Sequence, residues 1–151
     1  MSRVKVIKNI NWDGLELHNE VNIVADIIKL DIINGVRQGT DINGSPFEPL
    51  AASTIRQKRK KGQPDAPLIA TGQMHEVYTK PRAKKGKEIA GIQVPKGRSG
   101  VNRIVVGSIH NKGIGLPKRE WFGISKTALG KIDKSLKLRL REKLRQKRVV
   151  K

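Results

Sequence analysis

The feature that most limits how this chain folds is a long helical pattern, from about residue 20 to 38, that is apolar on two sides. Its apolar residues recur at steps of three and four and form two stripes: Val21, Val24, Ala25, Ile28 and Ile32, and then Ile23, Ile27 and Leu30. A helix with this much apolar surface is usually covered on more than one side. A sheet is one expected cover, and either a neighbouring subunit or complete burial supplies the other. Gly39 is the expected C-cap.

A second long helix is predicted from Ser125 to Arg148, with the Ser125 hydroxyl capping its N-terminus. Most positions outside its apolar residues are Lys or Arg, so we expect it to pack along one narrow stripe. That stripe consists of Leu129, Ile132, Leu136, Leu140 and Leu144.

Strands are predicted on both sides of a turn-rich segment. Residues 101–109 contain the β-branched run Ile104, Val105 and Val106, and residues 89–94 form a shorter apolar segment. The connection at 95–102 suits an antiparallel hairpin between them. Alternation within residues 3–17 predicts a further strand, and residues 51–61 a short helix.

The predicted fold class is α+β, with a small, mostly antiparallel sheet of about four strands packed with the apolar helix and the basic C-terminal helix. We expect one α+β domain over residues 1–125, with basic loops at about 55–65 and 80–100, and a basic helix and tail over 126–151. The chain has only five aromatic residues, so an aliphatic core is expected.

The charge is divided unequally along the chain. Residues 1–50 hold 5 basic and 7 acidic side chains (net −2), and residues 51–151 hold 27 basic and 6 acidic ones (net +21), which together give +19. Such an excess indicates a polyanionic partner, either nucleic acid or an acidic protein face. The candidate contact residues are Arg56, Lys58, Arg59, Lys60, Lys61, Lys84, Lys85, Arg139, Lys143 and Arg145.

No constellation typical of catalysis stands out. His18, His75 and His110 are isolated from one another and from carboxylates at metal-ligand spacing. The chain has no cysteine, the Gly-rich turns lack the spacing of a phosphate loop, and no apolar run approaches the roughly 20 residues that span a bilayer. We therefore expect no enzymatic activity, no metal or cofactor and no membrane contact. The N-terminus also lacks the apolar region of a signal peptide.

Three segments resemble a known family. Residues 44–50 (GSPFEPL), followed by Thr54 and Lys58, are similar to its "G-x-x-F-x-P-L … T … K". Residues 67–74 (PLIATGQM) are similar to "x-L-I-x-T-G-x-L", and residues 109–125 (IHNKGIGLPKREWFGIS) to "IHxxG … PxRxFxGlS". The family is that of phage tail-completion and neck proteins, the virion-morphogenesis family that includes the G-type protein of Mu-like phages.

The resemblance implies a structural virion protein at the head–tail joint or tail end. It implies a ring, expected to be sixfold, that contacts tail-tube or head–tail connector proteins and forms in the cytoplasm of a bacterial host. DNA passing through the joint is a second expected contact. The residues that carry the resemblance, for which we expect structural roles, are Gly44, Phe47, Pro49, Leu50, Thr54, Lys58, Leu68, Thr71, Gly72, His110, Gly113, Pro117, Arg119 and Trp121.

Within this role, we expect subunit contacts from helix 20–38 and from the segment 109–125, which its glycines and proline predict to be an ordered loop. The alternative is a freestanding basic nucleic-acid-binding protein. Its charge fits, but the basic runs lack interleaved aromatics for base stacking, and no helix-turn-helix or zinc pattern is visible. A small nuclease is disfavoured, because only 6 acidic residues follow residue 50.

Overall fold

The computed structural model describes residues 15–71, 74, 76–94 and 103–149. It confirms the α+β class. In chain order the elements are α1 (His18–Gln38), α2 (Ala52–Lys60), β1 (Tyr78–Thr79), β2 (Ile92–Gln93), α3 (Arg103–Lys112) and α4 (Lys126–Val149).

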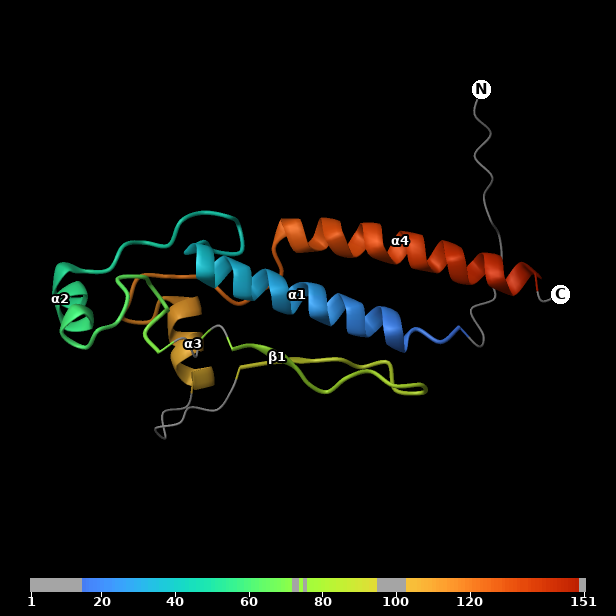
Figure 1. Ribbon diagram of the computed structural model, residues 1–151, viewed down its shortest axis with the longest axis horizontal. Helices are drawn as coiled ribbons and strands as arrows, with labels where there is room; N and C mark the ends of the chain where they lie inside the picture. The colour runs from blue at the N-terminus through green and yellow to red at the C-terminus, as the bar shows by residue number, and fades with distance from the viewer. Residues whose placement is uncertain (1–14, 72–73, 75, 95–102, 150–151) are drawn as a thin grey trace, which may run out of the picture.

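The long helices α1 and α4 lie side by side and run in opposite directions (Figure 1). The hairpin formed by β1 and β2 lies along the other side of α1, α3 lies near the C-terminal end of α1, and α2 lies beyond that end. The central helix therefore has a helix on one side and a hairpin on the other. This explains why its sequence is apolar on two faces.

The helix boundaries follow the predicted capping chemistry. Gly39 ends α1 in the left-handed conformation (φ 70°), and the next amide, that of Thr40, donates to the Gly35 carbonyl at 2.9 Å. At the start of α4, the Ser125 Oγ accepts a hydrogen bond from the Ala128 amide at 2.9 Å. Both caps satisfy backbone groups that a helix end leaves without an intrahelical partner.

The prediction of a strand at residues 101–109 is wrong. Its described part belongs to α3, so the predicted loop 109–125 begins only after Lys112. Residues 92–93 instead pair antiparallel with 78–79, with Tyr78 opposite Gln93 and Thr79 opposite Ile92. Among the described residues the sheet has these two strands and not about four. The expected strand at 3–17 and the connection at 95–102 fall largely or wholly outside those residues.

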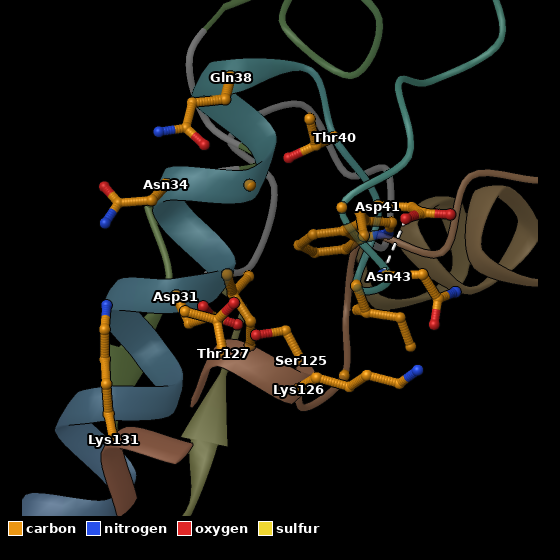
Figure 2. A pocket seen from close by; sticks show the side chains of 16 residues that line it. Asp31, Asn34, Gln38, Thr40, Asp41, Asn43, Ser125, Lys126, Thr127 and Lys131 are labelled. Atoms are coloured by element: carbon orange, nitrogen blue, oxygen red, sulfur yellow. Dashed lines mark hydrogen bonds between the residues drawn. The ribbon is translucent and has the colours of Figure 1, made fainter. Parts of the chain in front are cut away.

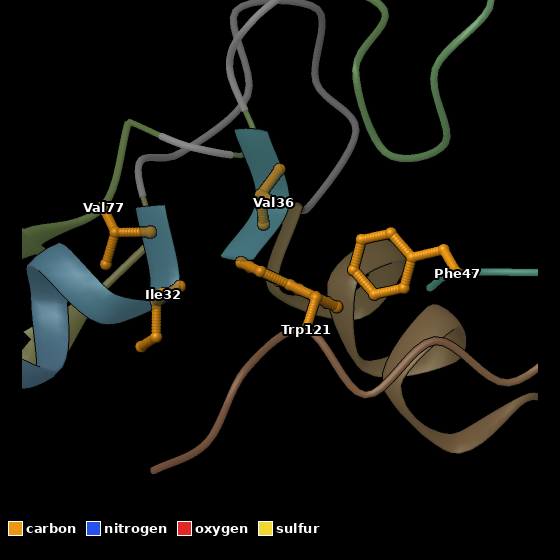
Figure 3. Packing of buried hydrophobic residues seen from close by; sticks show 5 residues of the cluster. All are labelled: Ile32, Val36, Phe47, Val77 and Trp121. Atoms are coloured by element: carbon orange, nitrogen blue, oxygen red, sulfur yellow. The ribbon is translucent and has the colours of Figure 1, made fainter. Parts of the chain in front are cut away.

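The core lies where α1, the 40–50 loop, the start of the hairpin and the loop after α3 meet. The expectation of an aliphatic core was incomplete, because two of the five aromatic residues lie inside it. The buried cluster consists of Ile32, Val36, Phe47, Val77 and Trp121 (Figure 3).

The hairpin is held against α1 by polar contacts away from this core. The Asn22 side chain donates to the Ala83 carbonyl at 2.9 Å and accepts from the Ala83 amide at 2.8 Å. Four residues along α1, both oxygens of Asp26 accept from the Arg82 Nη1 at 2.7 and 2.8 Å. This hydrogen bond from Arg82 lowers the pKa of Asp26.

Candidate functional site

The three segments that carry the family resemblance come together around the buried core. Arg119, only 4% exposed, donates from its Nη2 to the Glu48 carbonyl at 2.9 Å. The neighbouring Glu120 carbonyl accepts from the Ile42 amide at 2.9 Å. These bonds join the third segment to the first, which lies about 70 residues earlier in the chain.

Trp121 connects the third segment with α3. Its indole is buried beside Phe47, and its Nε1 donates to the Gly107 carbonyl at 3.0 Å. A Cβ on Gly107 would lie 2.7 Å from the Trp121 Cζ2, so only a glycine lets the indole pack this closely on the helix. The next residue, Phe122, donates from its amide to the Asn111 Oδ1 at 3.0 Å. Loop and helix therefore form one packed unit.

Lys58 joins the first segment to the second. Its Nζ donates to the Ala66 carbonyl at 2.7 Å and to the Ile69 carbonyl at 2.5 Å, and burial lowers its pKa. Leu68, between these two carbonyls, adopts a positive φ of 60°, which is uncommon for a residue with a side chain. Lys58 thus fastens the backbone on both sides of an unusual turn.

His110 takes part in the loop through its backbone. Its carbonyl accepts from the Arg119 amide at 2.8 Å. Its side-chain Nδ1 is buried without a hydrogen-bond partner among the described residues. Burial, with a smaller effect from the Arg119 charge, lowers the pKa of this imidazole.

The other motif residues occupy turns and surface positions. Gly44 and Gly113 have positive φ values of 84° and 72°. A Cβ on Gly113 would lie 2.9 Å from the Lys118 Cβ. Gly72 lies outside the described residues. Of the remainder, Leu50, Leu68 and Pro117 are half-buried, and Pro49, Thr54 and Thr71 are exposed.

An apolar surface lies open between α1 and the loop after α3. One cleft of about 350 Å³ is lined by the first α1 stripe, from Val21 to Ile32, and by Ile92, Phe122 and Ile124. A second cleft, of about 390 Å³, shares Ile92 and Phe122 and extends along α3 past Ile104. The stripe of α1 that lines the first cleft is one of the two apolar stripes that the sequence predicts to be covered.

The predicted basic contact residues fall into two groups. Three pair with carboxylates: Arg59 with Asp65 at 2.7 Å, Lys85 with Glu16 at 2.6 Å, and Lys143 with Glu20 at 2.7 Å. Lys58 is occupied by backbone carbonyls. The residues that remain exposed, with no ion pair to any described residue, are Arg56, Lys60, Lys61, Lys84, Arg139 and Arg145.

Glu20 is a buried acidic group, with only 3% of its surface exposed. Burial by itself raises the pKa of a carboxyl group. The hydrogen bond from Lys143, a hydrogen bond from the Glu20 backbone amide and the charge of Lys143 together outweigh this effect. The pKa of Glu20 therefore lies below its usual value. Lys143 also donates to the Glu16 carbonyl. It therefore ties the C-terminal half of α4 to the start of α1.

A polar cleft between the C-terminal half of α1 and the start of α4 was not anticipated from the sequence. Figure 2 shows Asp31, Asn34 and Thr127 among its lining residues. The Asp41 carboxylate at its edge is already occupied, because it accepts from the Asn43 and Ser45 amides at 2.8 and 2.9 Å.

Within the described residues, no group of three His, Cys, Asp or Glu side chains lies close enough to hold a metal ion. In the same part of the chain, no helix is both long and apolar enough to cross a membrane.

Sequence reasoning missed four lysines and arginines on the exposed side of α4, namely Lys131, Lys134, Lys137 and Arg141. A helical projection would have found them, because they recur at steps of three and four residues on the side opposite the apolar stripe.

Comparisons of the chain with models of protein families, with curated proteins and with solved structures found no match.

Proposed function

We propose that this protein is a structural component of a tailed phage or prophage particle, acting in tail completion or head–tail joining as a ring of identical subunits. The proposal starts from the resemblance of three short segments to the tail-completion and neck proteins. The role requires binding surfaces and no conversion of a substrate.

The observation that carries the proposal is the convergence of those segments. They are separated along the chain, yet Arg119 bonds to Glu48, and Lys58 bonds to Ala66 and Ile69. Phe47 and Trp121 share one core, against which Leu68 packs. Residues that form a family motif are expected to support one another in this way when they build a common scaffold.

The open apolar surface supports the ring. Ile124 is 47% exposed and Ile104 is 59% exposed, and both line clefts that meet at Phe122. Contiguous exposed apolar surface with a polar surround commonly marks a protein interface. In the proposed ring this surface contacts the next subunit, and exposed basic residues face acidic surfaces of the tail tube or connector.

Self-association is tested by paired variants. Ile124→Glu places a charge in the apolar cleft, and Leu129→Glu makes the same change at a 53% exposed position of α4 outside it. We expect native mass spectrometry to show oligomers for the wild type and for Leu129→Glu, and monomers for Ile124→Glu. A wild-type protein that stays monomeric at every concentration contradicts the ring.

The assembly role is tested in the particle. Trp121→Ala removes the side chain that joins the loop to α3, so we expect electron microscopy to show unfinished tails, or full heads without tails, while tail-tube protein is still made. A normal yield of particles from this variant, or from a deletion of the gene, contradicts the role.

A further inference from the structure

We propose that the outward side of α4 binds the phosphate backbone of duplex DNA. The segment 126–149 carries 10 basic and 2 acidic residues. Exposed cations recur along it at steps of three and four residues, and Leu138 lies among them. The members of this basic stripe are Lys131, at the edge of the polar cleft between α1 and α4, and then Lys134, Lys137, Arg141 and Arg145.

Four of the five cations of the stripe have no ion pair within the described structure. Lys137 pairs with Asp133 at 2.6 Å, and the other four have no ion pair with a described residue. Two of the three acids of the neighbouring helix α1 pair with other residues, and the third, Asp31, lines the polar cleft that Lys131 also lines. Glu20 pairs with Lys143, and Asp26 with Arg82 and Lys29. Most of the stripe therefore presents uncompensated charge to solvent.

The composition of the stripe favours a nucleic acid over an acidic protein. A stable protein interface usually has an apolar core with a polar rim. The only large apolar side chain within the stripe is Leu138, which is 53% exposed. A phosphate backbone needs no such core, because released counterions supply most of the binding free energy.

The same composition favours a duplex over a single strand. Proteins that hold single strands stack the bases on aromatic side chains, and α4 has no aromatic residue. From Lys131 to Arg145 the helix rises about 21 Å, a length over which duplex DNA carries about a dozen charges. Contacts to phosphates alone carry no direct sequence information, so binding is expected to be independent of sequence.

The salt dependence of DNA binding tests this site. We would titrate a fluorescent duplex of about 30 base pairs at salt concentrations of about 0.05–0.2 M. Five phosphate contacts predict a slope of about −4.5 for the logarithm of the association constant against the logarithm of the salt concentration. This corresponds to a loss of affinity of about 500-fold over that range.

A charge-matched pair of double variants locates the contact. Lys134→Gln with Arg141→Gln removes two charges from the stripe, and Lys60→Gln with Lys61→Gln removes two exposed charges at α2, far from most of α4 (Figure 1). The first is expected to reduce the slope to about −2.7 and the affinity at 0.1 M salt by roughly 60-fold. The second should leave the slope unchanged.

The charge-preserving exchange of Lys134→Arg with Arg141→Lys should keep the wild-type slope, and circular dichroism should show the same helix content in every variant. Equal losses in the two neutralised variants would mean that binding follows total charge, and would overturn the site. The site would also be overturned if the wild-type protein bound polyglutamate but not DNA at low salt. That result would assign the stripe to an acidic protein. Because DNA binding is measured on the isolated protein, its failure leaves the particle experiments to judge the assembly role separately.

Discussion

Two helical glycines lie in opposite environments, and the same substitution should therefore have opposite effects. In α3, Gly107→Ala would place a Cβ 2.7 Å from the Trp121 ring and 3.3 Å from the Met74 Cε. In α4, a Cβ on Gly130 would meet nothing within 4 Å. Alanine favours a helix by roughly 0.5–1 kcal/mol over glycine, whereas overpacking costs about 1–3 kcal/mol.

We therefore expect Gly130→Ala to raise the free energy of unfolding by about 0.5–1 kcal/mol. Gly107→Ala should lower it by about 1–2 kcal/mol, because the clash outweighs the helix propensity. Urea denaturation followed by circular dichroism measures both. A gain in stability for Gly107→Ala would show that the indole does not pack on this helix.

His110 should make stability depend on pH near neutrality. Its pKa in the folded protein lies below the ordinary value of 6.5, so the unfolded chain binds its proton first as the pH falls. The contribution of His110 to stability is then complete above pH 6.5 and decreases as the pH falls from there toward the folded pKa.

Denaturation curves at several pH values between about 5 and 8 measure this effect, because histidine is the side chain that ordinarily titrates there. His110→Gln should weaken the dependence of the free energy of unfolding on pH in this range. The lowered pKa of Glu20 affects stability at lower pH. The stability that ionised Glu20 contributes is lost as the pH falls below about 4.5. An unchanged slope near neutrality in His110→Gln would remove the proposed effect of its burial.

At the scale of elements, one amide side chain of α1 binds both backbone groups of a hairpin residue, beside the ion pair of Asp26 with Arg82. Asn22 satisfies both backbone groups of the buried Ala83. Asn22→Ala leaves those groups without partners, which costs on the order of 1–2 kcal/mol. We expect trypsin to cut the hairpin tip, at Lys84, Lys85 or Lys87, about 5–30 times faster when this contact is lost.

Asn34→Ala provides the control for this experiment, because Asn34 is an exposed residue of the same helix. It should leave the rate of cleavage unchanged. Equal acceleration in both variants would mean that the helix itself has loosened and that Asn22 does not hold the hairpin in particular.

The elements that the sequence predicted well are those whose signals are local. Periodic apolar residues and caps gave α1 and α4 nearly to the residue, because Gly39 and Ser125 act within one turn of the helix end. The segment around Val105 was misjudged, since β-branched residues favour strands. There, Ile104 and Val105 are 59% and 52% exposed, and Gly107 packs on Trp121, a tertiary contact that the local pattern does not reveal.

The candidate site was predictable to a similar extent. The motif residues Phe47, Arg119 and Trp121 were identified by pattern, but their contacts join positions far apart in the chain, which no spacing rule reveals. More basic residues were predicted to contact a partner than the folded chain leaves available, for the same reason. The carbonyls that hold Lys58 and the carboxylate that holds Lys143 are assembled only by folding.

At the scale of the whole molecule, folding places α1 between the hairpin and the basic helix α4 (Figure 1). Ion pairs join Glu16 to Lys85 of the hairpin and Glu20 to Lys143 of α4. An ion pair neutralises equal and opposite charges, so these pairs leave the net charge of +19 unchanged. An isolated molecule of this charge repels itself, and the repulsion opposes both compact folding and close approach of a second copy.

Added salt should therefore act in opposite directions on stability and on DNA binding. Screening shortens the range of the repulsion, because the Debye length falls from about 30 Å at 0.01 M to about 8 Å at 0.15 M salt. The buried pair of Glu20 and Lys143 is screened much less than exposed charges. We expect the melting temperature of the isolated protein to rise with sodium chloride concentration, whereas its affinity for DNA falls.

The variant Lys134→Gln with Arg141→Gln, with a net charge lower by two, should melt higher at low salt and gain less from added salt. A melting temperature that decreases with salt would mean that the ion pairs between α1, the hairpin and α4 outweigh the repulsion among the surface cations.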